Sequence, residues 1–358
     1  MALHSLLVQN LRILEHLEIS LAQDANLFVG ENGAGKTSIL EAIDILSRGR
    51  SFRERRTQPL LRKNAQGLVV SCKLREANSK IQLGIQKTAK LTTLHRDGER
   101  VASISSHASS LPVVSMHPDS HQLIQGGAKQ RRNYLDWSAF HVKHTFLQNW
   151  RDYNKCLRQR NQALRDQCSD KELQVWTHEL SQKAISVDRE RSLIFEQLKP
   201  IFEEYSRRLL PECDVAISYF RGWTLEQDLD KALMEVHAQE RQKKTTRMGA
   251  HRANLKITLD QQDAAATASR GQQKLIAASL LLAQVEHLQL QQDNKCIVLL
   301  DDVRAELDQQ HANALLKALQ SLGCQVFITA IEAEQIDISG WQDRKVFHVK
   351  QGVCAQLE

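Results

Sequence analysis

The 358-residue sequence predicts a mixed α/β protein in which a sheet-based domain with a β-rich lobe is interrupted by an inserted helical arm. Three observations predict this class: strand patterns dominate the first third, long amphipathic helices fill the middle, and strands alternate with helices in the last third. A sheet domain that resumes after a purely helical stretch is typical of a domain insertion. We therefore expect three segments, namely residues 1–127, the helical arm at 128–212, and residues 213–358.

The composition is ordinary for a globular protein, because 42% of the residues are hydrophobic and 25% are charged. The 48 lysines and arginines exceed the 42 aspartates and glutamates, and the net charge of +6 permits an anionic partner without requiring one. No run approaches the roughly 18 apolar residues of a membrane span, and the N-terminus lacks the layout of a signal peptide. The seven cysteines form no Cys-x-x-Cys pair. We expect a cytoplasmic protein with reduced thiols, no zinc site and no membrane association.

The first third is predicted to be rich in strands. Short apolar segments open the chain, and a helix with Ile39 and Ile43 on its apolar face follows and stops at Gly49. Alternating apolar residues then return, and Asp97-Gly98 predicts a hairpin turn. The strand-like segments are residues 3–13, 14–22 and 26–30 and, within 67–116, GLVVSCKL, KIQLGIQK, LTTLHRDGER and LPVVSM.

The middle of the chain is predicted to form an antiparallel helical hairpin. Two stretches, one from residue 128 and one from residue 171 to about 209, carry hydrophobic residues at spacings of three, four and seven, and only QCSD separates them. We expect these stripes to pack on each other or on a neighbouring lobe without a cofactor. The stripe residues are Phe146, Trp150, Tyr153, Leu157 and Leu164 in the first stretch and Leu173, Trp176, Leu180, Val187, Ile194, Leu198, Ile201 and Tyr205 in the second.

Residues 30–38, GENGAGKTS, match the phosphate-binding pattern Gly-x-x-x-x-Gly-Lys-Ser/Thr. An apolar strand precedes the match and a helix follows it, so backbone N–H groups and the helix N-terminus can converge on phosphate oxygens. Lys36 is expected to reach the β- and γ-phosphates of ATP, and the Thr37 hydroxyl to complete the shell of Mg²⁺. The alternative is a glycine-rich turn with a solvated lysine. The expected nucleotide-binding residues are Gly30, Glu31, Asn32, Gly33, Ala34, Gly35, Lys36, Thr37 and Ser38, together with Arg12.

Strand patterns return after residue 213 with DVAISYF and NLKITL, and later with CIVLLDDV and QVFITA. The uninterrupted apolar run Cys296–Leu300 is expected of a central parallel strand, and Asp301 and Asp302 follow it at the edge where α/β sheets bind ligands. We expect Asp301 to bind Mg²⁺ and Asp302, as a catalytic residue with Lys36, to polarise a water in line with the γ-phosphate. The alternative for each aspartate is a role in a turn or a helix cap.

The helix at ASRGQQKLIAASLLLA begins with Ser269, Arg270, Gly271 and Gln272. Together with the phosphate-binding loop and the acidic strand, this order resembles the ABC-type ATPases, whose Leu-Ser-Gly-Gly-Gln signature serves the nucleotide held by the opposite subunit. Arg270 stands in place of the first glycine. The resemblance implies an ATP-dependent homodimer in which Ser269, Gly271 and Gln272 contact the nucleotide of the other subunit. The alternative is a serine that only caps its helix.

The resemblance also implies the fold: an ABC-type ATPase head, in which a P-loop sheet carries a β-rich lobe, interrupted by an inserted helical arm domain. ATP and Mg²⁺ are the cofactors that it implies. DDVRAELD parallels the superfamily's Asp-Glu-Pro-x-x-x-Leu-Asp, so Asp308 falls at the position that reads the dimer interface. Two departures favour slow hydrolysis: Ala330 stands near the usual histidine position, and SMHPDSHQ shows no clear Q-loop glutamine.

Within this superfamily, LRILEHLEI, LFVGENGAGKTSILEAI, RGRSFR, RRNYLDW, SRGQQK, LLDDVRAELD and QVFITA together resemble the RecF family of bacterial recombination mediators. RRNYLDW, residues 131–137, and the arginine in the signature discriminate most, because transporter ATPases and SMC proteins lack that combination. The resemblance implies ATP-driven dimerisation on DNA, both duplex and single-strand/double-strand junctions, with weak DNA-dependent ATP hydrolysis. It also implies cooperation with RecO and RecR in loading RecA at gaps.

Arginines are dense between residues 48 and 63, and we expect Arg50, Arg53, Arg55 and Arg56 to contact DNA phosphates. A solvated charged face is the alternative. A second basic set lies at 241–252, and RRNYLDW combines cations with aromatic residues that can stack on bases, although core packing is favoured for it.

Three functions are compatible with these motifs. The leading one is a DNA-binding ATPase switch. The alternatives are a transporter-type ABC ATPase subunit and a scaffold that binds ATP without hydrolysing it. The basic cluster and Arg270 count against the transporter, and phosphate release stimulated by duplex DNA would separate the scaffold from the switch.

Overall fold

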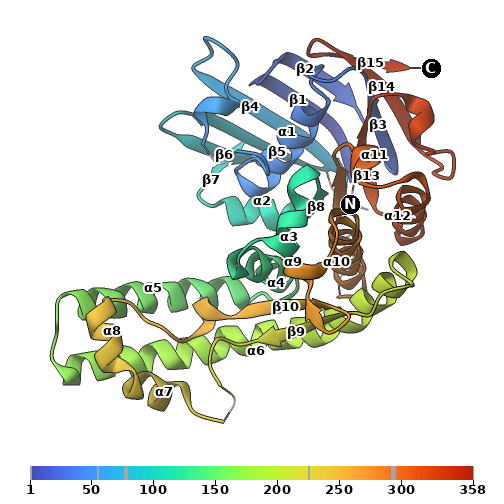
Figure 1. Ribbon diagram of the computed structural model, residues 1–358. Helices are drawn as coiled ribbons and strands as arrows, with labels where there is room; N and C mark the ends of the chain where they lie inside the picture. Colours follow the sequence, from blue (N-terminus) through green and yellow to red (C-terminus); the bar gives the residue numbers. More distant parts are fainter. Residues whose placement is uncertain (1, 55, 76–79, 225, 292–295, 358) are drawn as a thin grey trace. The chain divides into compact units, whose positions relative to one another are not determined.

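The computed structural model describes residues 2–54, 56–75, 80–224, 226–291 and 296–357. Its contacts divide the chain into two compact units (Figure 1). The head unit comprises Met1–Ser120 and Ala277–Glu358, and the arm unit comprises His121–Ile276. The arm unit thus contains the expected helical segment and also the strands and the signature segment that follow it. The domain boundaries after residues 127 and 212 stay a prediction.

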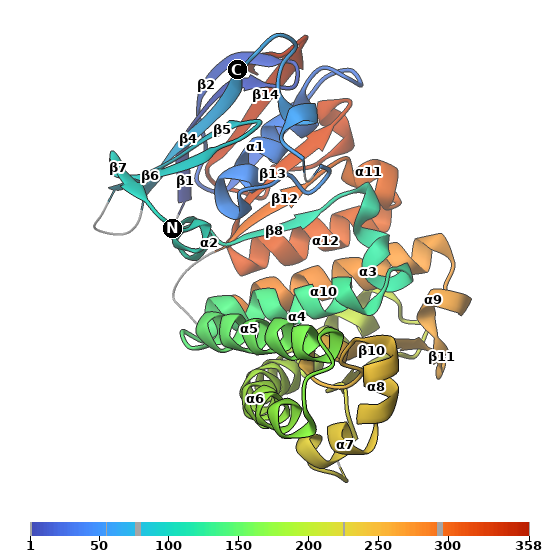
Figure 2. The same cartoon turned by 90° about the vertical axis from the view of Figure 1, so that its left-hand side faces the viewer.

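Two six-stranded sheets form the framework of the head unit (Figures 1 and 2). The first is antiparallel and is built, in spatial order, from β2 (Leu14–Ser20), β1 (Ala2–Leu11), β4 (Gly67–Arg75), β5 (Lys80–Thr88), β6 (Thr92–Arg96) and β7 (Glu99–Val101). The second contains, in spatial order, β15 (Val353–Leu357), β14 (Arg344–Lys350), β3 (Ala25–Val29), β13 (Gln325–Ala330), β12 (Ile297–Leu300) and β8 (Val113–Met116).

The second sheet is parallel from β14 to β8, and only β15 runs antiparallel to its neighbour. LPVVSM was predicted as one of the alternating strands within residues 67–116. It does contain a strand, β8, but the predicted alternation is wrong, and β8 pairs in parallel with β12 in the second sheet. Val113 and Val114 are both buried, which is the pattern of a strand covered on both faces rather than of an alternating strand. The predicted hairpin is confirmed: Asp97 and Gly98 have φ of 52° and 87° and join β6 to β7.

Helix α1 (Lys36–Arg48) lies between the two sheets, where it contacts β1, β4 and β5 on one side and β13 on the other (Figure 1). The predicted stop is confirmed, since Gly49 caps the helix in the left-handed conformation with φ of 71°. The sequence predicted one apolar face, yet eleven of the thirteen residues are buried, because a sheet covers each side. The remaining helical segments of the head unit are η1 (Gln58–Leu60), α2 (Ile104–Ser110), η2 (Pro118–His121), α11 (Val303–Glu306), α12 (Gln309–Leu322) and η4 (Ala333–Gln335).

The arm unit is built on an antiparallel pair of long helices, α5 (Phe146–Arg165) and α6 (Asp170–Leu209), which confirms the predicted hairpin (Figure 1). The stretch expected from residue 128 is divided: α4 (Ala128–Val142) ends before α5 begins. Trp150, expected in the apolar stripe, has 39% of its surface exposed. The other elements are α3 (Gln122–Gln125), α7 (Leu229–Glu235), α8 (His237–Lys243), η3 (Ala250–Arg252), α9 (Ala264–Thr267), α10 (Arg270–Gln291, which ends in the head unit) and a sheet of β11 (Gln262–Asp263), β10 (Asn254–Leu259) and β9 (Val215–Phe220).

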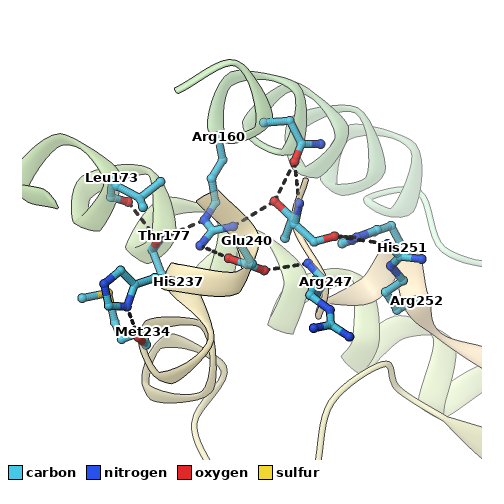
Figure 3. A network of polar contacts seen from close by, with 11 residues as sticks. Arg160, Leu173, Thr177, Met234, His237, Glu240, Arg247, His251 and Arg252 are labelled. Carbon is cyan, nitrogen blue, oxygen red and sulfur yellow. Dashed lines mark hydrogen bonds and ion pairs between the residues drawn. The ribbon is translucent and has the colours of Figure 1, made fainter. Parts of the chain in front are cut away.

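A buried arginine ties α8 to the helical pair (Figure 3). Arg160 on α5 is completely buried, and its guanidinium donates to Thr177 Oγ1 on α6 at 3.0 Å and to Glu240 Oε2 on α8 at 2.7 Å. A third bond reaches Thr246 Oγ1 at 2.9 Å, and the Arg247 backbone N–H donates to Glu240 Oε1 at 2.6 Å. Arg160 occupies a position of the apolar stripe, three residues after Leu157 and four before Leu164, but it was not singled out from the sequence. A salt bridge together with a hydrogen bond from each of the three guanidinium nitrogens is what makes the buried charge tolerable.

Tyr153 and His251, the latter labelled in Figure 3, form a second polar contact next to this network. His251 Nε2 lies 3.1 Å from the Thr246 carbonyl oxygen, so Nε2 carries the proton. Nδ1 therefore accepts from the Tyr153 hydroxyl at 2.6 Å, and the ring is neutral. Burial lowers the pKa of His251 to about 4. Gly249, with φ of +127°, makes room, because a Cβ there would lie 2.8 Å from the Tyr153 oxygen.

The lowered pKa of His251 predicts that the arm unit loses stability in mild acid. In the unfolded chain the histidine takes up a proton near its ordinary pKa of 6.5, whereas in the folded chain it does so only near pH 4. Between these two values the unfolded chain binds more protons, and protonation therefore favours unfolding. As the pH is lowered through this window, the free energy of unfolding should decrease by at most about 1.4 kcal/mol per pH unit. Urea unfolding followed by tryptophan fluorescence suits the measurement, since four of the five tryptophans lie in the arm unit.

The control for this prediction is His251→Gln, which keeps an N–H donor but cannot titrate. Other groups titrate equally in both proteins, so the difference between parent and variant isolates His251. A parent that loses no more stability than the variant between about pH 6.5 and about pH 4.5 would show that the ring is not held neutral.

Across the part that the structure describes, no helix is both long enough and apolar enough to cross a membrane. All seven cysteines are free thiols, as predicted, and Cys72, Cys156, Cys296 and Cys324 are buried.

Candidate functional site

The phosphate-binding motif forms a loop between β3 and α1, as its sequence predicted. Strand β3 is buried along its whole length and delivers the chain to Gly30, where φ is +145°. A Cβ at Gly30 would lie 2.2 Å from the Val349 carbonyl oxygen, so only glycine fits. Gly33 and Gly35 also have positive φ, of 80° and 115°. The loop therefore turns tightly into the N-terminus of α1, whose free N–H groups favour an anion.

Lys36 lies over this loop. Its Nζ donates to the carbonyl oxygens of Gly30 at 2.5 Å and Glu31 at 2.9 Å, and the side chain is largely buried. Burial lowers the pKa of Lys36, while Asp302 and Asp301 act in the opposite direction. An ammonium group has three N–H donors, and two are used here. Of the other loop residues, Ala34 and Ser38 are buried, and Glu31, Asn32 and Gly33 are exposed.

The structure brings Thr37 and Asp301 together from positions 264 residues apart in the sequence. The Thr37 hydroxyl donates to Asp301 Oδ1 at 2.8 Å. Asp301 follows the fully buried strand β12, and its backbone N–H donates to the Met116 carbonyl oxygen on β8 at 2.9 Å. Burial raises the pKa of Asp301, and hydrogen bonds from Thr37 and Thr329 oppose that change by stabilising the carboxylate.

Asp302 adopts an uncommon backbone conformation. Its φ of 53° and ψ of 50° are left-handed, and it stands at the N-terminus of α11. Its N–H donates to Thr329 Oγ1 on β13 at 2.8 Å, and the same hydroxyl donates to Asp301 Oδ1 at 2.9 Å. Thr329 was not predicted from the sequence. The available signal was a threonine near the end of an otherwise apolar strand segment.

These residues fit Mg²⁺, because a hydroxyl and a carboxylate oxygen within hydrogen-bonding distance are hard oxygen donors of the kind that this ion prefers. The loop fits a phosphate group for a separate reason: glycines with positive φ at positions 30, 33 and 35 turn the backbone into the N-terminus of α1, where free N–H groups favour an anion. Both fits rest on contacts within the head unit.

A second cluster, centred on Glu41, was also missed. Glu41 lies one helical turn beyond Thr37 on α1, and its side chain is completely buried. Arg12, in the turn between β1 and β2, donates to both of its carboxylate oxygens at 2.9 and 2.8 Å, and this pair raises the pKa of Arg12. The Ser51 hydroxyl donates to the same carboxylate at 2.6 Å. An acidic residue inside an apolar helix was the available signal.

The arginine loop expected to contact DNA begins at the end of α1. Arg50 is exposed, and Arg53 and Arg56 have 51% and 82% of their side-chain surface exposed. Arg53 lies 3.9 Å from Glu41, and Arg56 lies 3.6 Å from Glu54, so part of the positive charge is balanced. Ser51 Oγ accepts from the Arg53 and Glu54 backbone N–H groups, which orders the loop. Arg55 lies outside the described residues.

The signature segment opens α10 in the arm unit with a reciprocal cap. The Ser269 backbone N–H donates to Gln272 Oε1 at 2.8 Å, and the Gln272 backbone N–H donates to Ser269 Oγ at 3.2 Å. Gln272 Nε2 also lies 3.4 Å from Cys213 Sγ. Ser269, Arg270 and Gly271 are exposed. The capping role weighed for Ser269 is thus present in the geometry.

Other residues singled out in the sequence have structural contacts. Arg131 donates to Asn254 Oδ1 at 2.9 Å and to the Gly126 carbonyl oxygen at 2.7 Å, and Tyr134 is buried, which raises its pKa. These contacts accord with the core packing favoured for RRNYLDW. Arg241 of the second basic set pairs with Asp170 at 2.7 Å.

Two positions in the head unit bear on the departures from the ABC-type pattern. Asp308 caps α12, since it accepts from the His311 backbone N–H at 3.0 Å. Ala330 is buried at the end of β13, opposite Val29. In the segment that shows no clear glutamine, the His117 ring stacks on Phe52 with centroids 4.8 Å apart.

The comparisons with known proteins cover nearly the whole chain. The family model described as RecF/RecN/SMC N terminal domain matches residues 2–355. The chain is 39% identical over 354 residues to the DNA replication and repair protein RecF of Thioalkalivibrio sulfidiphilus, covering 98% of each chain. It is 37% identical over 362 residues to the RecF protein of Pseudomonas aeruginosa strain LESB58, covering 99% of this chain and 98% of the relative.

Solved structures show the same fold. The recombination mediator protein RecF with ATP, in the RecFOR pathway, superposes with a TM-score of 0.89 at 24% identity, over 100% of this chain and 98% of that one. The Smc head bound to the C-winged helix domain of ScpA superposes with a TM-score of 0.61 at 14% identity, over 100% and 97%. The expected ABC-type head fold is confirmed by these likenesses.

Proposed function

This chain belongs to the RecF family of DNA replication and repair proteins, within a family of ATP-binding ATPases, and from that premise we propose that it is an ATP-dependent, DNA-binding recombination mediator. The single observation that carries the proposal is the contact between Thr37 and Asp301 beside the glycine loop. That contact joins the helix that begins at the phosphate-binding loop to the acidic end of β12, as a nucleotide switch requires.

Each site residue has a proposed role. The backbone of Gly30–Ser38 and the N-terminus of α1 bind the triphosphate of ATP, and Lys36 donates its third N–H to it. Thr37 and Asp301 hold Mg²⁺, which when bound neutralises phosphate charge. Asp302 orients the attacking water and accepts its proton. We propose that hydrolysis is slow, because the buried Ala330 offers no side chain able to donate a hydrogen bond. That it depends on DNA is proposed from family membership.

The signature segment has a proposed role in a homodimer that ATP induces. Ser269 already accepts a hydrogen bond within its cap, yet a hydroxyl keeps one O–H donor for a phosphate oxygen. The exposed Gly271 lets the backbone approach, and the N-terminus of α10 favours negative charge. We infer that these groups, together with Gln272, complete the nucleotide site of a second copy, related by two-fold symmetry.

DNA is the proposed anionic partner. Arg50, Arg53, Arg55 and Arg56 bind phosphates of duplex DNA and of single-strand/double-strand junctions, and the exposure of Arg53 and Arg56 supports this role. Cooperation with RecO and RecR in loading RecA at gaps is proposed from family membership.

A DNA-binding titration over a series of salt concentrations tests the proposed function. The parent should bind gapped duplex more tightly than blunt duplex, and only when ATP is present. Replacing both Arg53 and Arg56 with alanine should weaken binding to both DNAs and reduce the slope of log affinity against log salt by about 0.9 for each DNA phosphate that the variant no longer neutralises. Arg100→Ala, at an exposed arginine on β7, is the matched control. Equal binding of both DNAs with and without ATP would exclude the proposed switch.

A further inference from the structure

Thr329 is the hydroxyl that connects the two acidic residues of the site. It lies on β13 with 1% of its surface exposed. Its Oγ1 donates to Asp301 Oδ1 at 2.9 Å and accepts from the Asp302 backbone N–H at 2.8 Å. A hydroxyl has one proton to donate, so Thr329 gives it to Asp301 and offers a lone pair to Asp302. One side chain thus contacts both residues at once.

Each of these two bonds restrains a group that needs restraint. Asp302 has φ of 53° and ψ of 50°, a conformation that residues other than glycine seldom adopt without local support. The bond from its N–H to Thr329 supplies such support from the neighbouring strand. The Asp301 carboxylate is held at one oxygen, Oδ1, which accepts a hydrogen bond from the Thr37 hydroxyl and another from the Thr329 hydroxyl.

We propose that Thr329 is a positioning residue for the ATPase site, which fixes the Asp301 carboxylate for Mg²⁺ and holds Asp302 in its left-handed conformation. This inference rests on the proposed function. Thr329 touches neither nucleotide nor metal; it acts through the two aspartates. Because its neighbour Ala330 carries no polar group, Thr329 is the residue at the end of β13 that can do this. Mutation of a group that orients a metal ligand typically lowers metal affinity or activity by about 10- to 100-fold.

The test compares Thr329→Val, Thr329→Ser and the parent. Valine has the shape of threonine but removes both hydrogen bonds, whereas serine keeps the hydroxyl. The equilibrium affinity for ATP is measured in EDTA and again in Mg²⁺, and the ratio of the two is the readout. We expect Thr329→Val to bind ATP in EDTA within about twofold of the parent, and to lose about tenfold of the gain that Mg²⁺ provides. Thr329→Ser should recover most of that gain.

Two controls separate positioning from folding. Ile328→Val, on the same strand and fully buried, removes a methylene without touching a polar group. The melting temperature of each variant without nucleotide reports any general loss of stability. Thr329→Ala serves as a second variant without a hydroxyl if the valine protein does not fold.

The outcomes are distinct. A parent that binds ATP with no gain from Mg²⁺ contradicts the proposed function itself. A parent with the gain, together with a Thr329→Val protein that keeps all of it, overturns this inference and leaves the function standing. Equal losses of ATP affinity in EDTA and in Mg²⁺, together with a lowered melting temperature, show that Thr329 only supports the fold, which also overturns it.

Discussion

Replacing Lys36 with methionine is expected to lower the affinity for ATP by about a hundredfold or more, and with it to abolish dimerisation that depends on ATP. The ammonium group reaches the glycine loop through two carbonyl oxygens, and methionine fills a similar volume without a charge or a donor. Hydrogen bonds to charged groups contribute about 1.5–3 kcal/mol each, and every 1.4 kcal/mol or so is a factor of ten in affinity. Calorimetric titration with ATP measures the first effect and sedimentation velocity the second.

Ser269→Arg provides the contrasting variant. Ser269 is exposed at the start of α10 and, in the proposed dimer, serves the nucleotide of the second copy, so the arginine should leave ATP affinity within about twofold and still prevent pairing of two copies. The two variants therefore separate binding from assembly. A parent that stays monomeric in saturating ATP would refute the proposed dimer, and an unchanged ATP affinity in Lys36→Met would refute the proposed nucleotide site.

Arg160→Met is expected to destabilise the arm unit by about 3–5 kcal/mol. The change leaves the Glu240 carboxylate buried without its cation and removes the donors to Thr177 and Thr246. Losing one partner of a buried pair is costly because the remaining charge has neither water nor a counter-ion. Urea unfolding followed by tryptophan fluorescence measures the loss.

Two matched variants sharpen this prediction. Arg165→Met makes the same replacement at an exposed position of α5 and should cost no more than about 0.5 kcal/mol. Adding Glu240→Gln to Arg160→Met removes the stranded charge and should recover part of the stability. If Arg160→Met costs no more than Arg165→Met, the pair does not hold α8 to the helical hairpin.

Contiguous signals in the sequence predicted much of the fold and of the site. The phosphate-binding loop and the acidic strand are each complete within a dozen residues, and the stop of α1 at Gly49 depends on one residue. Local patterns suffice where backbone conformation and burial decide the structure. The long helices of the arm unit were predicted for the same reason.

What the sequence did not predict depends on partners far away along the chain. Thr329 meets Asp302 across 27 positions, and Arg160 meets Glu240 across 80. Arg160 lies on the apolar stripe of α5, three residues after Leu157 and four before Leu164, so its spacing indicated burial. No local pattern indicates its partner Glu240, which lies on α8. The pairing of β8 was missed likewise, since a short apolar strand fits either sheet until its neighbour is known.

The buried carboxylate of Glu41 has a mechanical consequence. Glu41 belongs to the helix that starts at the phosphate-binding loop. Its carboxylate accepts hydrogen bonds from Arg12, in the turn between β1 and β2, and from Ser51, whose side chain orders the first residues of the arginine loop. Three stretches of chain thus share a single negative charge that water does not reach. A displacement of one of these segments strains its hydrogen bonds to the shared carboxylate, so the other two segments must adjust with it. Movement at the phosphate-binding loop is thereby coupled to movement of the arginine loop.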